Sequence, residues 1–337
     1  MKAIILDQPG SFSTADIPEP QPTAGEALVR ISRIGMCGTD LHAYRGRQPF
    51  FTYPRILGHE LCAELVEIGS NAQGLQAGMF CSVAPYLYCG ECLACRSGKS
   101  NCCVKLQLLG VHVDGGLREF FAVPLHTLHH SAALTREQLA LVEPLSIGAH
   151  AVGRAQLKPD ETILVIGAGP IGLAVIAHAK AAGVKTIAMD VSADRLRFAR
   201  EQFQVAATID AGENVLEQLS DLTNGEMPSV VFDATGNPAS MNETFNYPAN
   251  GGRIVMVGLH LDFVTFRDQD FHRRELTVMS SRNATAADFQ RTISLLETGQ
   301  INLDPWVTHR VQASALIAQF PSWLDAQAGF IKAVVEW

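Results

Sequence analysis

The sequence predicts an α/β protein built from a mostly β domain and a doubly wound domain with a parallel sheet. Its 337 residues exceed what one ordinary core organises, which favours two domains. The first part contains short β-type runs, such as residues 2–6 and 27–34, that are broken by proline and glycine. After Pro159, apolar strand candidates alternate with helix-length segments, which indicates a parallel sheet covered by helices on both faces.

The second part offers six strand candidates, the number found in a full dinucleotide-binding sheet. They are residues 162–166, 185–189, 206–209, 229–233, 253–257 and 276–280. A helical pattern over 286–297 and a β-like run over 333–337 follow, and we expect this tail to rejoin the first domain. We therefore assign residues 1–145 and 284–337 to the β domain and residues 146–283 to the parallel-sheet domain.

Composition excludes several classes of function. The chain has 26 basic and 34 acidic residues and a formal charge of −8, without basic runs, which disfavours a nucleic-acid partner. No signal peptide or long apolar segment is evident, so we expect a soluble cytoplasmic protein with no membrane association. Five of the eight cysteines crowd into residues 89–103, which favours metal binding over disulfides.

A glycine motif marks the expected nucleotide site. Gly167, Gly169 and Gly172 have the G-x-G-x-x-G spacing directly after a strand candidate and at the start of a helical segment over 171–182. The first glycine permits a tight turn, the second admits a pyrophosphate, and the third lets helix and strand pack closely. A glycine triplet alone can arise by chance in a turn, and the flanking strand and helix give this one its weight.

An acidic residue extends this motif. Asp190 follows the second strand, eighteen residues after Gly172, where it can accept hydrogen bonds from both ribose hydroxyls and so favours NAD over NADP. It could instead cap the helix that begins near Ala193, and Arg195 could flank the adenine or be a solvated helix residue. The remaining residues that we assign to the cofactor are Pro170, Ile171, Thr235 and Gly258.

Two sets of residues predict zinc. Cys89, Cys92, Cys95 and Cys103 have a C-x2-C-x2-C-x7-C spacing that can surround one tetrahedral structural zinc, with Cys102 as a competing fourth ligand. A redox role for the C-x-x-C pairs is weaker, because they lie outside any βαβ pattern. The candidates for a catalytic zinc are dispersed, and each could also be structural; they are Cys37, His59, Glu60 and Glu143.

Several segments resemble the zinc-containing medium-chain alcohol dehydrogenases. The segments 35–42 (GMCGTDLH) and 58–60 (GHE) carry this resemblance, and 142–150 (VEPLSIGAH) looks like the polyol branch. The segments 48–51 (QPFF), 110–116 (GVHVDGG) and 281–285 (SRNAT) look like bacterial L-galactonate 5-dehydrogenases and their starvation-sensing relatives. Ala63 and Met79 depart from the family pattern, which bears on packing near the site.

The resemblance implies a GroES-like catalytic domain formed by both chain ends around a central Rossmann domain. It implies that Cys37, His59 and Glu143 bind the catalytic zinc, with Glu60 either ligating in turn or holding a zinc-bound water. Thr39 and His42 match the proton relay of the family, for which His42 titrates in a useful range. His42 could equally be an uninvolved surface histidine.

The expected reaction is oxidation of a secondary hydroxyl with hydride transfer to NAD. Arg282 follows the sixth strand and could pair with the carboxylate of a sugar acid such as L-galactonate, or brace the domain junction. A polyol, a simple alcohol, a non-catalytic NAD-binding sensor and a zinc-free quinone reductase are the alternatives. We also expect a homo-oligomer, a dimer or tetramer.

Overall fold

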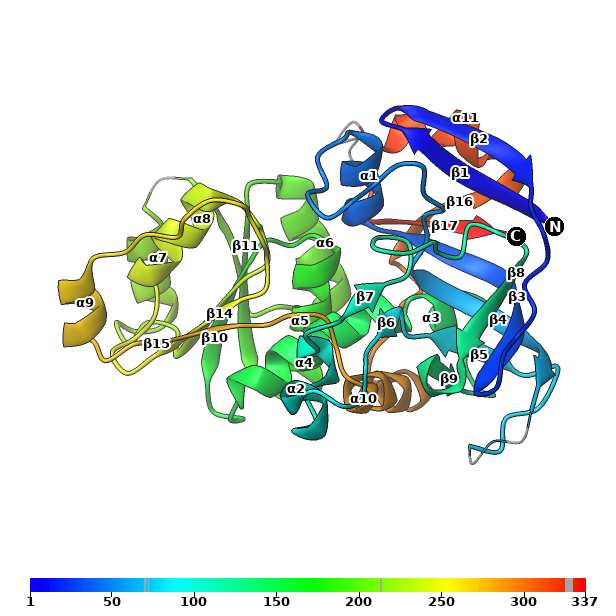
Figure 1. Ribbon diagram of the computed structural model, residues 1–337. Coiled ribbons are helices and arrows are strands. Elements are labelled where there is room, and N and C mark those ends of the chain that lie inside the picture. The colour runs from blue at the N-terminus through cyan, green and yellow to red at the C-terminus, as the bar shows by residue number, and fades with distance from the viewer. Residues whose placement is uncertain (70, 72, 213, 325–329) are drawn as a thin grey trace. The chain divides into compact units, whose positions relative to one another are not determined.

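The computed structural model describes residues 1–337 except 70, 72, 213 and 325–329, and it divides the chain into two compact units (Figure 1). One unit consists of Met1–Glu143 together with Thr285–Trp337, and the other is Pro144–Ala284. The domain boundaries at residues 145/146 and 283/284 stay a prediction. Among the described residues, no helix is long and apolar enough to cross a membrane.

The unit Pro144–Ala284 is built on a six-stranded parallel sheet with strand order β12-β11-β10-β13-β14-β15. This is the doubly wound order of dinucleotide-binding folds, and it confirms the predicted fold class. The strands are β10 (Thr162–Ile166), β11 (Lys185–Asp190), β12 (Ala207–Asp210), β13 (Val230–Asp233), β14 (Arg253–Met256) and β15 (Thr277–Ser280). Its helices are α5 (Pro170–Ala181), α6 (Ala193–Phe203), α7 (Val215–Leu222), α8 (Pro238–Glu243) and α9 (Asp268–Arg273).

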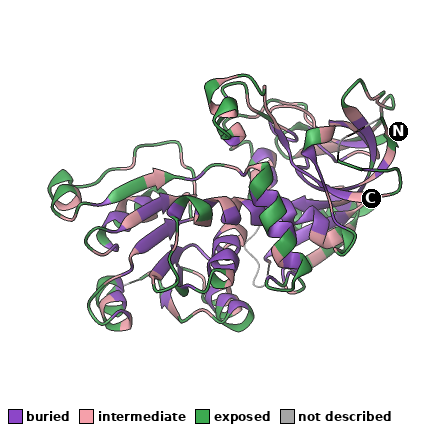
Figure 2. Ribbon diagram, turned by 90° about the horizontal axis from the view of Figure 1, so that it is seen from below, coloured by how far each residue is buried: buried purple, intermediate pink, exposed green. Residues whose placement is uncertain are grey.

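Burial explains why the central strands are apolar on both faces. β13 is buried throughout, since helices cover a parallel sheet on both sides (Figure 2). Helix α5 is likewise buried over most of its length, which accounts for an apolar sequence without a polar face. β15 is the end strand of the sheet, and three of its four residues are exposed.

The other unit is mostly β and contains a seven-stranded sheet. The strand order is β16-β17-β3-β4-β5-β9, and β8 also pairs with β3. These strands are β3 (Glu26–Met36), β4 (Glu60–Ile68), β5 (Phe80–Val83), β8 (Phe120–Pro124), β9 (Leu128–His130), β16 (Val307–Gln312) and β17 (Lys332–Glu336). Two small sheets pair β1 (Lys2–Gln8) with β2 (Ser11–Asp16) and β6 (Tyr86–Leu87) with β7 (Gln107–Leu108).

Short helices complete this unit. They are α1 (Gly38–Tyr44), α2 (Leu93–Arg96), α3 (Arg136–Ala140), α10 (Ala286–Glu297) and α11 (Leu316–Gln319). Helix α4 (Val142–Ala155) begins in this unit, and the division between the units falls after its second residue. The predicted helix over 286–297 coincides with α10.

The register of three neighbouring strands joins distant parts of the chain. Gly35 on β3 is opposite Glu60 on β4 and opposite Val334 on β17. The C-terminal strand β17, red in Figure 1, therefore lies beside the blue strand β3. Helix α1 begins directly after β3, so the end of β3, the start of β4 and the start of β17 converge at one place.

Candidate functional site

The converging strand ends bring together the residues of the expected catalytic metal site. One ligand atom each of Cys37, His59 and Glu60 lies within 4.8 Å of the others. Cys37 precedes the first turn of α1, and Glu60 is the first residue of β4. His59 and Glu60 are buried, and Cys37 is partly exposed. A thiol, an imidazole and a carboxylate in this arrangement form a suitable donor set for zinc.

Glu143 lies near this group without belonging to the set of atoms within 4.8 Å. It is the second residue of α4 and is 3% exposed. The Tyr86 hydroxyl donates a hydrogen bond of 2.5 Å to Glu143 Oε1. Burial raises the pKa of Glu143 to about 7; His59 opposes this shift, and Glu60 adds to it. Three of the four predicted catalytic ligands are thus assembled, and the fourth is a buried neighbour.

A buried aspartate, Asp40, lies beside the candidate zinc ligand His59. Asp40 Oδ1 lies 3.7 Å from His59 Nδ1, and neither atom has a hydrogen-bond partner among the described residues. Asp40 Oδ2 accepts a hydrogen bond from Cys37 N at 2.9 Å. Burial opposes protonation of His59, but Asp40 and then Cys37 raise its pKa well above the usual value. A carboxylate facing one ring nitrogen is the usual support of a histidine that binds metal through the other, so this pair fits zinc.

A buried lysine holds the neighbouring glutamate. Lys332 Nζ contacts both oxygens of Glu60, at 2.7 and 2.9 Å, and donates to the Met36 carbonyl at 3.2 Å. The side chains of Lys332 and Glu60 are 2% and 0% exposed. Gly35 provides the room, because a Cβ at this position would lie 2.0 Å from Glu60 Oε2. Burial lowers the pKa of Lys332, but Glu60, Cys37 and Glu143 together raise it, and the net direction is upward.

Sequence reasoning did not identify Asp40, Lys332 or Tyr86. A signal was present for Lys332, because a lysine within an apolar terminal strand is rarely buried unless it is paired. Asp40 could have been inferred from its position three residues after Cys37, where a side chain can cap the first turn. For Tyr86 the sequence holds no comparable signal.

The two predicted relay residues lie on helix α1. Thr39 is partly exposed and His42 is exposed, and their spacing of three residues places them on one face of the helix. Partial burial lowers the pKa of His42, and the charges of Arg45 and Arg47 lower it further. A histidine with a lowered pKa is neutral at pH 7 and can accept a proton.

The second predicted zinc cluster is assembled from one loop. The ligand atoms of this cluster, from Cys89, Cys92, Cys95 and Cys103, all lie within 4.8 Å of one another. The Sγ–Sγ distance is 3.4 Å between Cys89 and Cys103, 3.5 Å between Cys92 and Cys95, and 4.0 Å between Cys89 and Cys95. Four thiolates around one zinc stand about 3.8 Å apart, so the cluster has the dimensions of a zinc site. Cys102 is exposed and outside this cluster.

Local backbone groups prepare the cysteines for this role. The backbone N–H groups of Cys89 and Lys105 donate to Cys103 Sγ, both at 3.3 Å, and lower the pKa of that thiol. Backbone donors lower the pKa of Cys92 to about 6. The small sheet of β6 and β7 closes the loop that carries the cluster. Thiolates are the form that binds metal, so these donors favour zinc binding.

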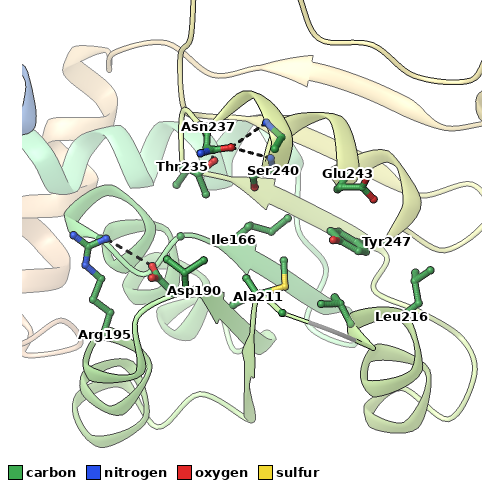
Figure 3. Close-up of a pocket in the computed structure, with 18 of the residues that line it drawn as sticks. Ile166, Asp190, Arg195, Ala211, Leu216, Thr235, Asn237, Ser240, Glu243 and Tyr247 are labelled. Carbon is green, nitrogen blue, oxygen red and sulfur yellow. Dashed lines mark hydrogen bonds and ion pairs between the residues drawn. The ribbon is translucent and has the colours of Figure 1, made fainter. Parts of the chain in front are cut away.

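The predicted nucleotide motif borders a pocket of about 910 Å³ in the unit Pro144–Ala284 (Figure 3). Gly167 has φ +90°, which favours glycine, and a Cβ on Gly172 would lie 1.6 Å from the Gly167 carbonyl oxygen. A Cβ on Gly169 would meet only Arg195, at 3.7 Å. The protein itself therefore does not require a glycine at 169, and the open space there faces a ligand-sized pocket.

Asp190 lies at the rim of this pocket, at the end of β11. Its Oδ2 accepts from Ala168 N at 2.6 Å and its Oδ1 from Ser192 N at 2.8 Å. Arg195 Nη1 is 3.8 Å from Asp190 Oδ2, the contact dashed in Figure 3. Ser192, and not Asp190, is the N-cap of α6. The alternative reading of Asp190 as a helix cap is therefore wrong.

The other residues assigned to the cofactor have different surroundings. Pro170 and Ile171 lie in the first turn of α5, directly after the glycine turn. Thr235 lines the pocket and donates to Asp233 through its N–H and its hydroxyl. Gly258 packs against the neighbouring loop, where a Cβ would lie 2.2 Å from Gly236 N.

Arg282 lies two residues beyond β15 and is exposed. It belongs to the unit Pro144–Ala284, whereas the metal-type cluster belongs to the other unit. Its predicted contact with a substrate carboxylate stays a prediction.

Two family models match the chain. Residues 23–133 match the alcohol dehydrogenase GroES-like domain, and residues 170–298 match the zinc-binding dehydrogenase model. The first match covers Cys37, His59 and Glu60, and the second begins inside the glycine motif.

Similar proteins match nearly the whole chain. L-galactonate-5-dehydrogenase of Escherichia coli K12 is 40% identical over 99% of this chain and 98% of its own length. The 2-dehydro-3-deoxy-L-galactonate 5-dehydrogenase of Pseudoalteromonas atlantica is 30% identical over 97% of this chain and 96% of its own. A crystal structure of a short chain alcohol dehydrogenase (rspB) from Escherichia coli CFT073, complexed with NADH, superimposes with a TM-score of 0.93 at 30% identity and covers 100% of this chain and 99% of that one.

Proposed function

Since the chain belongs to the zinc-binding dehydrogenase family of oxidoreductases, we propose that it oxidises a secondary hydroxyl of a sugar acid with NAD⁺ as hydride acceptor. The substrate that we propose is L-galactonate or a close relative, because two of the similar proteins are named for oxidation at carbon 5 of galactonate-type acids. The observation that carries the proposal is the cluster of Cys37, His59 and Glu60, with Asp40 beside His59 and Lys332 beside Glu60.

We assign the catalytic zinc to Cys37, His59 and Glu143, with Glu60 as the neighbouring carboxylate. When bound, zinc lowers the pKa of a coordinated hydroxyl, and the nicotinamide accepts the hydride. Asp40 orients His59 through the ring nitrogen that faces it. Lys332 holds Glu60 in place within a buried region through contacts with both of its oxygens. We assign the structural zinc to the four-cysteine loop, where it would hold together the segment between β6 and β7.

For the nucleotide, we propose the glycine turn as the pyrophosphate site and Asp190 as the ribose ligand. The first turn of α5 directs free backbone N–H groups toward a phosphate. The carboxylate of Asp190 would repel a 2′-phosphate, which favours NAD over NADP. Arg195, already 3.8 Å from Asp190, then lies beside the adenosine. Thr235 borders the same pocket.

We propose that Thr39 and His42 carry the substrate proton to solvent. The lowered pKa of His42 leaves the ring neutral at pH 7, ready to accept a proton, and this ability is lost as the pH falls through that pKa. Replacement of His42 by alanine should therefore slow turnover mainly at the acidic end of the pH profile. An unchanged profile would remove His42 from the relay.

The central experiment combines a metal count with a substrate panel. We expect two zinc ions per chain and NAD⁺-dependent turnover that is fastest with L-galactonate among sugar acids, galactitol, sorbitol and simple secondary alcohols. Arg282→Ala should raise KM for acids and leave KM for polyols unchanged if this arginine pairs with the carboxylate. A fastest turnover with a polyol would correct the substrate class, and two zinc ions with no turnover would favour the non-catalytic sensor.

We also propose that the protein is a cytoplasmic homo-oligomer. Leu259, Leu261 and Phe263 are 71%, 73% and 84% exposed, and Val278 is exposed on the end strand β15. A second copy could pair with this strand edge and cover these side chains symmetrically. Val278→Lys should then shift the sedimentation coefficient toward the monomer. A cytoplasmic location is consistent with a cluster of reduced cysteines.

A further inference from the structure

We propose that Tyr86 is a positioning residue for the catalytic metal, because its hydroxyl fixes the direction of the Glu143 carboxylate. This inference rests on the proposed assignment of Glu143 as a zinc ligand. Its basis is geometric: the Tyr86 hydroxyl lies 2.5 Å from Glu143 Oε1, and both side chains are buried. A distance this short is typical of a hydroxyl that donates to a carboxylate.

The two buried glutamates near Cys37 and His59 are held differently. Lys332 contacts both oxygens of Glu60, whereas Tyr86 contacts one oxygen of Glu143. A carboxylate bound at one oxygen keeps the other oxygen as a ligand of defined direction. The contact from Tyr86 thus orients the Glu143 carboxylate, which would hold zinc mainly through the oxygen that Tyr86 does not contact.

The surroundings of Tyr86 make it a rigid support. Its ring packs edge-on against Phe289 at a centroid distance of 6.2 Å, and Phe289 is fully buried on α10. Phe289 in turn stacks on His129 at 4.7 Å. Tyr86 also lies on β6, three residues before Cys89, the first member of the cysteine cluster. The backbone of Tyr86 is therefore held in β6 and its ring is packed against a buried Phe289, which gives the hydroxyl a defined position.

The test is Tyr86→Phe, which keeps the ring and removes the hydroxyl. We expect zinc affinity at the catalytic site to fall 10- to 100-fold in competition with a chromogenic chelator, the range seen when a supporting hydrogen bond of a ligand is lost. Loading the site with Co²⁺ should show an altered ligand-field spectrum, a signature that a purely structural role of Tyr86 would not change. Zinc bound by the four-cysteine loop should be unaffected.

Tyr44→Phe is the matched control, because it removes a hydroxyl that donates to the Gly10 carbonyl, away from the cluster. Its zinc affinity and Co²⁺ spectrum should equal those of the wild type. In a Glu143→Ala background, Tyr86→Phe should cause no additional loss of affinity, because the two residues act through one contact.

An unchanged affinity and Co²⁺ spectrum in Tyr86→Phe overturn the inference while leaving the proposed function intact. An additional loss in the Glu143→Ala background also overturns it, since Tyr86 would then act through another group. A wild-type protein that binds only one zinc per chain overturns the proposed function, and this inference with it.

Discussion

The two metal-type clusters are built in opposite ways. Cys89, Cys92, Cys95 and Cys103 come from one loop, three of them are partly exposed, and the thiol of the buried Cys103 receives two backbone N–H donors. The other cluster combines Cys37, at the start of α1, with the adjacent residues His59 and Glu60 at the start of β4, and these face the side chains of Asp40 and Lys332. One site is therefore a property of a short segment, and the other is a property of the folded sheet.

This difference has an energetic consequence. The cysteine loop needs little from the rest of the protein, so its metal should stabilise mainly its own lobe. The buried cluster contains charges that are stable only when each has its partner, so a change in any one partner affects the whole group. Removal of the structural zinc should thus perturb the cysteine loop, and removal of a partner side chain from the buried cluster should perturb the sheet.

The largest effect is expected for Cys103→Ser. This variant should bind one zinc fewer per chain and lose about 5 kcal/mol or more of stability, because loss of a structural metal belongs to the most damaging class of substitution. Metal analysis and urea unfolding measure both quantities. Cys102→Ser is the control, since Cys102 is exposed and outside the cluster, and it should resemble the wild type. Full zinc content in Cys103→Ser would refute the assignment.

A second test removes a partner from the buried cluster. Lys332→Met leaves the carboxylate of Glu60 buried without its cation and should cost about 3–5 kcal/mol in the free energy of unfolding. Lys2→Met is the control: the pair of Lys2 and Asp16 is exposed and contributes about 0–1 kcal/mol. The double variant Glu60→Gln/Lys332→Met should recover part of the loss. Equal stability of Lys332→Met and Lys2→Met would contradict this account.

The neutral imidazole of His129 gives a pH-dependent effect. Burial lowers its pKa to about 4 from an ordinary value of 6.5, so the folded protein binds fewer protons than the unfolded chain. The contribution of His129 to the free energy of unfolding is fully present above about pH 6.5. It is lost as the pH falls toward 4, by about 3 kcal/mol in total. His129→Phe, which keeps a ring against Phe289, should show a shallower acid slope in urea unfolding. Parallel slopes would show that another group titrates.

The smallest effect is expected for Asp40→Asn. The amide keeps an oxygen for the Cys37 N–H but weakens the support of His59, so zinc affinity at the catalytic cluster should fall roughly 10- to 100-fold, and that at the cysteine loop should not change. Asp16→Asn is the control, because the Asp16 side chain is exposed. If both variants bind zinc like the wild type, Asp40 has no supporting role.

Much of the fold followed from local sequence patterns. The predicted strand 162–166 coincides with β10, which is a short run of mostly apolar residues. The predicted helix 286–297 coincides with α10, in which apolar residues recur at helical spacing. The terminal run was predicted from residue 333, whereas β17 begins at Lys332. A lysine usually marks a solvent-exposed position, and only its pairing with Glu60 reverses that expectation.

The sequence by itself determined the glycine turn and the cysteine loop, because each is specified by residues close along the chain. The spacing of Gly167, Gly169 and Gly172 fixes one turn, and a Cβ at the third position would collide with the first. Only the tertiary structure decided which buried groups face each other. Lys332 reaches Glu60, and Tyr86 reaches Glu143, through strand pairing and packing between distant segments, and such contacts leave no periodic signal in the sequence.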